Sequence, residues 1–140
     1  MNLFPLPQTA PDERSQRSPT VLVVDDYRSL CEVIAGMLRT RGYRVLMASS
    51  GEGAKVLARE NARIDLLLTD FEMPEMRGDE LATWFRAARP ETRILFMSSH
   101  TVTPRPVHLI PKPFHTEALV SKVREVLNHY SAPVAGAATA

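Results

Sequence analysis

The chain has 140 residues, 44% of them hydrophobic, which is enough for one domain with a single core. Its 17 basic and 16 acidic residues give a formal net charge of +1, so charge provides no basis for binding nucleic acid or an anionic membrane. The sequence contains no membrane-length apolar run and no signal-peptide pattern, and the single cysteine, Cys31, cannot form an internal disulfide. We therefore expect a cytoplasmic protein that contacts neither nucleic acid nor membrane directly.

Composition divides the chain into three parts. Residues 1–19 contain four prolines and many polar side chains without a period, so we expect a flexible N-terminal arm. Residues 20–129 carry the regular apolar patterns of a folded domain. Residues 130–140 are mostly small and patternless, which predicts a flexible C-terminal tail.

Within the predicted domain, short apolar runs alternate with patterns of helical period. The strands are predicted, in chain order, at residues 20–24, 43–49, 64–70, 93–99 and 107–110, and the helices at 30–41, 52–60, 81–88 and 119–127. Three of the strands are continuous apolar runs, as is typical of parallel strands that are covered on both faces. The alternation predicts an α/β fold with an open, doubly wound parallel sheet.

In such a sheet the binding site lies at the carboxyl ends of the strands. The residues at these ends are Asp25 and Asp26 after the first strand, Asp70 at the end of the third, Ser98 at the end of the fourth and Lys112 after the fifth. Three converging carboxylates repel one another unless a cation neutralises them, and Mg²⁺ prefers oxygen ligands of this kind. A lysine and a serine suit phosphate, and aspartate is a covalent acceptor of phosphoryl groups. The set predicts metal-assisted phosphoryl transfer onto Asp70.

Several of these residues also have an ordinary structural explanation. Asp26 could cap the following helix, Asp70 could open a turn before Pro74, and Lys112 alone could be a solvated surface lysine. The coincidence of suitable residues at every expected strand end favours the site.

Three segments together resemble the receiver domain of bacterial two-component response regulators. They are "VLVVDDY", "LLLTDFEMPEMRGDEL" with Met73, Pro74 and Gly78 after Asp70, and "KPF" at Lys112–Phe114. The resemblance covers roughly residues 20–129. It implies the flavodoxin-like receiver fold with five parallel strands, and a signalling protein rather than an enzyme that turns over a separate substrate.

The resemblance also implies a role for each site residue. Asp70 would accept a phosphoryl group from the phosphohistidine of a histidine kinase or phosphotransfer protein. Asp26 and Asp70 would bind Mg²⁺ directly, and Asp25 largely through water. The backbone carbonyl of Glu72 would also bind the metal. The Ser98 hydroxyl would contact the phosphate, and Lys112 would pair with a phosphate oxygen. The resemblance further implies a cis Lys112–Pro113 bond.

The chain departs from the family between the fourth strand and the lysine. This segment is several residues shorter than the family's, and Pro104 and Pro106 disfavour a regular helix there. We therefore expect the fourth helix of the family to be missing or replaced by a loop, with at most a single turn at 99–102. Leu109 stands where the family usually has an aromatic switch residue, and strand alternation should direct His108 to the opposite face.

Two further side chains are expected at the mouth of the site. Glu72 follows Asp70 by two positions, where the family tunes the lifetime of the phosphoryl group; it could position water or repel a donor. His100 follows Ser98 by two positions and is equally explained as a solvated loop residue.

The leading hypothesis is a stand-alone phospho-acceptor receiver that signals in trans to an unknown protein effector. A kinase or phosphotransfer protein would dock on the first helix, near Tyr27, Arg28 and Leu30. The alternative is a receiver-like adaptor that is not phosphorylated, which the missing helix and Leu109 favour. A haloacid-dehalogenase-like phosphatase is set aside, because "DDY" does not supply the DxD pattern of that class.

Overall fold

The computed structural model describes residues 18–137, with side chains described to residue 128. The elements in chain order are β1 (Thr20–Val24), α2 (Arg28–Arg39), β2 (Arg44–Ala48), α3 (Gly51–Glu60), β3 (Leu66–Asp70), α4 (Gly78–Ala88), β4 (Arg93–Ser98), β5 (Leu109–Pro111) and α5 (Thr116–Ala137). The predicted arm, 1–19, lies almost wholly outside the described residues.

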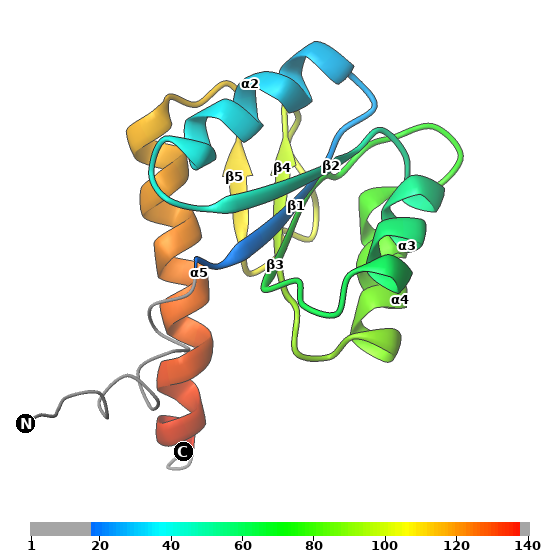
Figure 1. Cartoon of the computed structure of the whole chain (residues 1–140). Helices are drawn as coiled ribbons and strands as arrows, with labels where there is room; N and C mark the ends of the chain where they lie inside the picture. The colour runs from blue at the N-terminus through cyan, green and yellow to red at the C-terminus, as the bar shows by residue number, and fades with distance from the viewer. Residues whose placement is uncertain (1–17, 138–140) are drawn as a thin grey trace, which may run out of the picture.

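The five strands form one parallel sheet in the order β2-β1-β3-β4-β5. Helices α2 and α5 cover one face of this sheet and α3 and α4 the other (Figure 1). The predicted doubly wound α/β fold is confirmed. Because all five strands run in the same direction, their carboxyl ends meet at one edge of the sheet.

The side chains of the sheet divide between two apolar layers. Val21 and Val23 of β1 pack under α2 and α5, whereas Leu22 and Val24 pack under α3 and α4. β1 and β3 are buried along their whole length, which explains their continuous apolar sequences.

The segment between β4 and β5 contains no helix, as the prolines predicted; bends alone occur there. The described part of the chain therefore goes from β4 to β5 without a helix. Its fourth helix, counted along the chain, is α5, which comes after β5. Leu109 is 4% exposed and packs with Phe71, Phe96 and Ala82, so this aliphatic side chain lies inside the fold.

Most elements have boundaries that differ by a few residues from the predicted ones, and two of these differences have a clear physical cause. β5 begins at Leu109 and not at residue 107, because the chain before it is still in a bend and Val107 is 85% exposed. α5 continues past position 129 to Ala137, so most of the predicted tail has helical backbone, which its several alanines favour. The division into arm, domain and tail otherwise stays a prediction.

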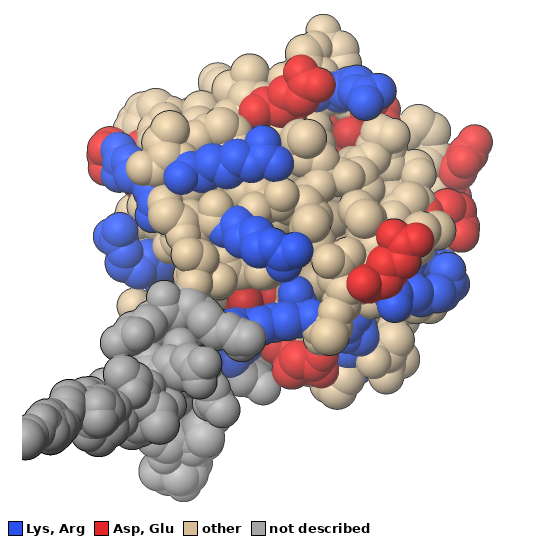
Figure 2. All heavy atoms as spheres, viewed as in Figure 1, with Lys and Arg blue, Asp and Glu red and all other residues tan. Residues whose placement is uncertain are grey.

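The surface agrees with the balanced composition. In the view of Figure 2, basic and acidic side chains are both present, in places side by side, and uncharged surface lies between these groups. Among the described residues, no helix is sufficiently long and apolar to cross a membrane.

Candidate functional site

The carboxyl ends of the strands bring the predicted acidic residues together. One carboxylate oxygen from each of Asp25, Asp26 and Asp70 lies within 4.8 Å of the others. Lys112 Nζ, just beyond β5, lies 3.2 Å from Asp25 Oδ2 and 3.1 Å from Asp70 Oδ1. Asp25 and Asp70 are buried, Lys112 is half-buried and Asp26 is exposed.

The charges in this cluster are not balanced. Burial raises the pKa of Asp70, and the charges of Asp25 and Asp26 raise it further, whereas Lys112 opposes the shift without cancelling it. Burial alone would lower the pKa of Lys112, but its hydrogen bond to Asp70 and the charges of Asp25 and Asp70 outweigh burial and raise it. Three carboxylates with one ammonium group leave the cluster short of positive charge.

The donor set fits a hard divalent cation. All three candidate ligands offer carboxylate oxygens, which Mg²⁺ prefers, and a ligand set with one exposed member leaves room for the waters that Mg²⁺ retains. A cation would also supply the positive charge that the cluster lacks.

A local hydrogen bond holds one of these three aspartates, and the start of α2 bears on a second. Asp25 Oδ1 accepts a hydrogen bond from the backbone N–H of Tyr27 at 2.9 Å. Helix α2 begins without a side-chain cap, so the alternative role of Asp26 as its N-cap is wrong.

Gly78, at the start of α4, packs closely against the backbone of Asp70 and Phe71. A Cβ atom at position 78 would lie 2.2 Å from the backbone oxygen of Asp70 and 2.9 Å from Phe71 Cα. The Gly78 N–H also donates to the Phe71 carbonyl at 2.9 Å. Only glycine permits this approach of α4 to the end of β3.

Ser98 lies at the end of β4, beside the lysine. Its backbone carbonyl accepts a hydrogen bond from the Lys112 N–H at 2.8 Å, and its side chain is buried. Its hydroxyl donates to the His100 carbonyl and accepts from the His100 N–H, both at 3.0 Å. The Lys112–Pro113 bond is cis, as predicted.

Glu72 and His100 form a contact that sequence reasoning missed. His100 Nδ1 lies 3.0 Å from Glu72 Oε1, and both side chains are exposed, at 69% and 52% respectively. The sequence indicated only that each residue follows a site residue by two positions. No sequence signal joined them, because the contact depends on how two separate loops meet.

A hollow beside the carboxylates is lined by apolar side chains of α2 and of the segment after β5. Tyr27 and Leu30, two of the three residues predicted to dock a partner, line this hollow. Its full lining comprises Asp25, Asp26, Tyr27, Leu30, Val33, Ile34, Met37, Asp70, Ser99, Lys112, Pro113 and Phe114. Arg28, the third, lines a different hollow.

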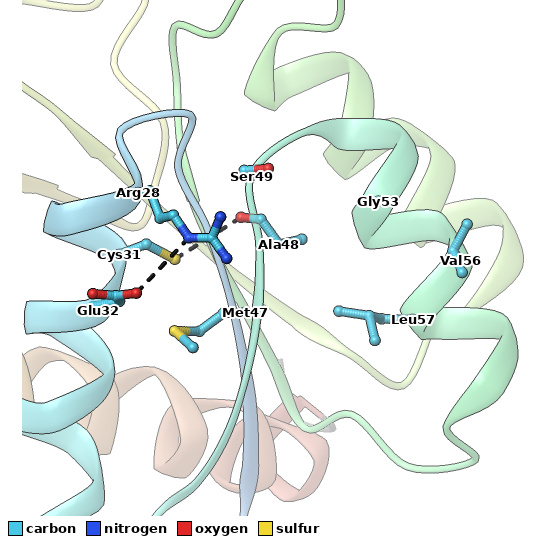
Figure 3. A pocket seen from close by; sticks show the side chains of 9 residues that line it. All are labelled: Arg28, Cys31, Glu32, Met47, Ala48, Ser49, Gly53, Val56 and Leu57. Carbon is cyan, nitrogen blue, oxygen red and sulfur yellow. Dashed lines mark hydrogen bonds and ion pairs between the residues drawn. The ribbon is translucent and has the colours of Figure 1, made fainter.

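That second hollow lies between α2, β2 and α3 and contains none of the predicted site residues (Figure 3). Arg28 pairs with Glu32 at its rim, and Met47 and Val56 contribute apolar surface. Burial raises the pKa of the Cys31 thiol to about 11, so this cysteine is not a nucleophile at neutral pH.

Comparison with known proteins agrees with this geometry. The model of the family "Response regulator receiver domain" matches residues 21–124, and the chain belongs to this family. It is therefore a receiver domain of the kind found in two-component signalling systems. Receiver domains are signalling modules and not enzymes in the usual sense.

The similar proteins include a response regulator receiver protein, Anae109_2439 of Anaeromyxobacter, which is 40% identical over 79 residues, or 56% of this chain and 33% of the relative. A crystal structure of the receiver domain of the hybrid histidine kinase CckA has a TM-score of 0.69 and 35% identity and covers 77% of this chain and 98% of that one. Chemotaxis protein CheY4 of Vibrio cholerae has a TM-score of 0.73 and 28% identity, with coverages of 78% and 98%.

The curated relatives are longer than the matched region. The chain spans between 13% and 51% of the length of the first curated relatives that it matches.

Proposed function

We propose that this chain is a phospho-acceptor receiver of a cytoplasmic two-component system or phosphorelay, with Asp70 as the acceptor. The observation that carries the proposal is the carboxylate cluster at the sheet edge, with Lys112 in contact with both Asp25 and Asp70. The donor is a histidine kinase or a phosphotransfer protein. The phosphorylated chain acts on a protein effector in trans.

In the proposed reaction an oxygen of the Asp70 carboxylate forms a bond to phosphorus as the bond between phosphorus and the donor's histidine nitrogen breaks. Lys112 Nζ, 3.1 Å from Asp70 Oδ1, binds an oxygen of the transferred group. The Ser98 hydroxyl rotates from the His100 carbonyl to donate to a second phosphoryl oxygen.

Asp25, Asp26, Asp70 and the Glu72 carbonyl are the proposed ligands of Mg²⁺. When bound, Mg²⁺ would neutralise negative charge on the phosphoryl oxygens and allow them to approach three carboxylates.

The test is incubation with acetyl phosphate and Mg²⁺, followed by the mass of the intact protein. We expect a gain of about 80 Da, the mass of one phosphoryl group on a carboxylate. The gain should be absent from Asp70→Asn and from a sample containing EDTA.

Beryllofluoride, a stable mimic of the phosphoryl group, resolves a negative result. If neither an adduct nor beryllofluoride binding is observed, the proposal is wrong. The receiver-like adaptor then becomes the better hypothesis, as the helix-free segment between β4 and β5 already allows.

A further inference from the structure

The strand β2 lies at one edge of the sheet, and its outer side has no neighbouring strand. The Arg44 N–H donates to the Pro19 carbonyl, so the backbone groups of Arg44 point inward, toward β1. These directions alternate along a strand, so the backbone groups of Val45 and Met47 point outward. The Val45 carbonyl accepts from Arg39 Nη2 at 3.1 Å. Within the described residues, nothing donates to or accepts from the outward groups of Met47.

The hollow between α2, β2 and α3 lies along this unpaired edge, and we call it the edge hollow (Figure 3). Its two walls differ in character. Arg28 and Glu32 form a charged wall on α2, whereas Val56 and Leu57 form an apolar wall on α3. A further strand beside β2 would lie between these walls, and because side chains alternate along a strand, one set would face α2 and the other α3.

The charges around the edge hollow favour an acidic occupant. The helix α2 and the strand β2 together contain three arginines, Arg28, Arg39 and Arg44, and a single acidic residue, Glu32. Glu32 pairs with Arg28, and no carboxylate among the described residues pairs with the exposed Arg39 and Arg44. The helix α3 contains two acidic and two basic residues, so it does not change this excess. A second copy of the chain would bring the same positive excess to the edge, which disfavours self-association there.

We propose that the β2 edge binds an extended acidic segment of a partner protein, which adds to the sheet as a further strand. The main chain of this segment pairs with the outward groups of Met47. Its apolar side chains pack on Val56, and its carboxylates meet Arg28 and Arg39. In this mode of recognition, main-chain hydrogen bonds supply affinity and the alternating side chains supply specificity. The inference does not depend on the phosphorylation of Asp70.

The experiment measures binding of a fluorescein-labelled peptide of alternating glutamate and valine to the full chain, by fluorescence anisotropy. Val56→Glu places a carboxylate on the apolar wall of the edge hollow. Val33→Glu is its matched control, because Val33 is also an exposed valine, at 54% against 46% for Val56, and lines the other hollow. Glu32→Gln removes the acidic residue from the charged wall.

We expect Val56→Glu to weaken binding by at least about 10-fold, the scale of a residue at the centre of an interface. Val33→Glu should change the affinity by less than about 2-fold. Glu32→Gln should strengthen binding by about 3-fold, the scale of one exposed charge, and added salt should weaken binding throughout. A peptide with lysine in place of glutamate should not bind.

Strand addition is tested separately from charge. Two further peptides are methylated at the backbone nitrogens, one at every glutamate and the other at every valine. Because successive residues of a strand direct their N–H groups to opposite edges, one of these peptides should lose binding and the other should keep it. Met47→Pro removes the outward N–H from the protein side without removing a bond to β1, and it should also abolish binding. The methylated peptides give the answer even if this variant does not fold.

Four outcomes would overturn the inference. The first is the absence of saturable binding to the wild-type chain, and the second is equal binding of the lysine peptide. The third is equal weakening by Val56→Glu and Val33→Glu, which would place the peptide elsewhere. The fourth is an equal effect of the two methylation patterns, which would mean that the peptide does not add as a strand. A dimer in sedimentation that Val56→Glu disperses would assign the edge to a second copy of the chain instead.

Discussion

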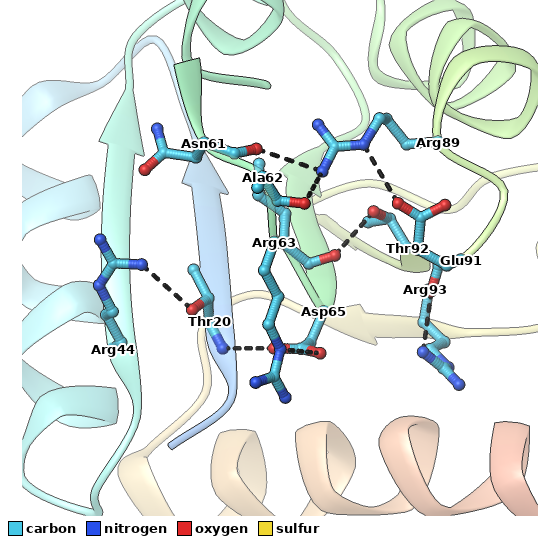
Figure 4. A network of polar contacts seen from close by, with 11 residues as sticks. Thr20, Arg44, Asn61, Ala62, Arg63, Asp65, Arg89, Glu91, Thr92 and Arg93 are labelled. Atoms are coloured by element: carbon cyan, nitrogen blue, oxygen red, sulfur yellow. Dashed lines mark hydrogen bonds and ion pairs between the residues drawn. The ribbon is translucent and has the colours of Figure 1, made fainter. Parts of the chain in front are cut away.

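Two aspartates flank the same strand and do different things. Asp65 immediately precedes β3, where its Oδ2 accepts a hydrogen bond from the Thr20 N–H at 2.7 Å and its Oδ1 pairs with Arg63 Nε at 3.2 Å (Figure 4). Asp70 ends β3, where it shares one lysine with Asp25 and lies near the carboxylate of Asp26. One carboxylate has a donor for each oxygen, and the other lies among like charges.

The neighbours of Asp65 complete a structural network at the amino ends of the strands. The Thr92 hydroxyl donates to the Ile64 carbonyl at 2.7 Å, and Arg89 donates to the carbonyls of Asn61 and Ala62 (Figure 4). These bonds tie the loop before β3 to the loop before β4. The comparison teaches that the supply of donors, and not the residue type, separates an anchoring aspartate from the aspartate that we propose as the phospho-acceptor.

The largest expected effect on stability comes from removing Lys112, the lysine that Asp25 and Asp70 share. Lys112→Ala leaves Asp25 and Asp70 buried without their common counter-charge, so we expect the free energy of unfolding to fall by about 3 kcal/mol in EDTA. Urea unfolding measures the loss, and saturating Mg²⁺ should recover part of it. The control is Lys122→Ala, which breaks a more exposed pair with Glu125 and should cost less than about 1 kcal/mol. Equal losses from the two variants would contradict the assigned charge balance.

Removing Asp65, the anchoring aspartate, should have the next largest effect on stability. Asp65→Ala removes the acceptor for the Thr20 N–H and the partner of Arg63, so we expect a loss of about 2 kcal/mol by urea unfolding. Phosphorylation by acetyl phosphate should keep its wild-type rate, because Asp65 lies at the opposite end of β3 from Asp70. A matched loss of phosphorylation in the folded variant would show that the two ends of the strand are not independent.

The smallest expected effect is a gain in stability, and it comes from replacing Asp70. Because the folded pKa of Asp70 is raised above its ordinary 3.8, stability that is fully present below pH 3.8 is lost as the pH rises through the folded value. Asp70→Asn should therefore raise the Tm at pH 7 in EDTA by a few degrees, the shift produced by about 1 kcal/mol. The gain should vanish below pH 3.8 and shrink in saturating Mg²⁺. A lower Tm for Asp70→Asn at pH 7 in EDTA would mean that the carboxylate stabilises the metal-free fold.

Much of the fold could be predicted from the sequence because its signals are local. The continuous apolar runs of β1 and β3 indicated buried parallel strands, and Pro104 and Pro106 indicated that no helix follows β4. The residues at the strand ends followed from topology, since parallel strands deliver their last residues to one edge. Element boundaries were predicted less well, because tertiary packing as well as the local apolar pattern decides where an element begins and ends. The late start of β5 and the long α5 are examples.

The sequence by itself determined the class of fold and the residue types at the sheet edge. Only the tertiary structure decided that Lys112 bridges Asp25 and Asp70, that Glu72 meets His100, and that the Asp26 side chain does not cap α2. The physical reason is distance along the chain. Periodicity and turn chemistry act within a few residues, whereas these contacts join loops whose positions are set by the packing of the whole sheet.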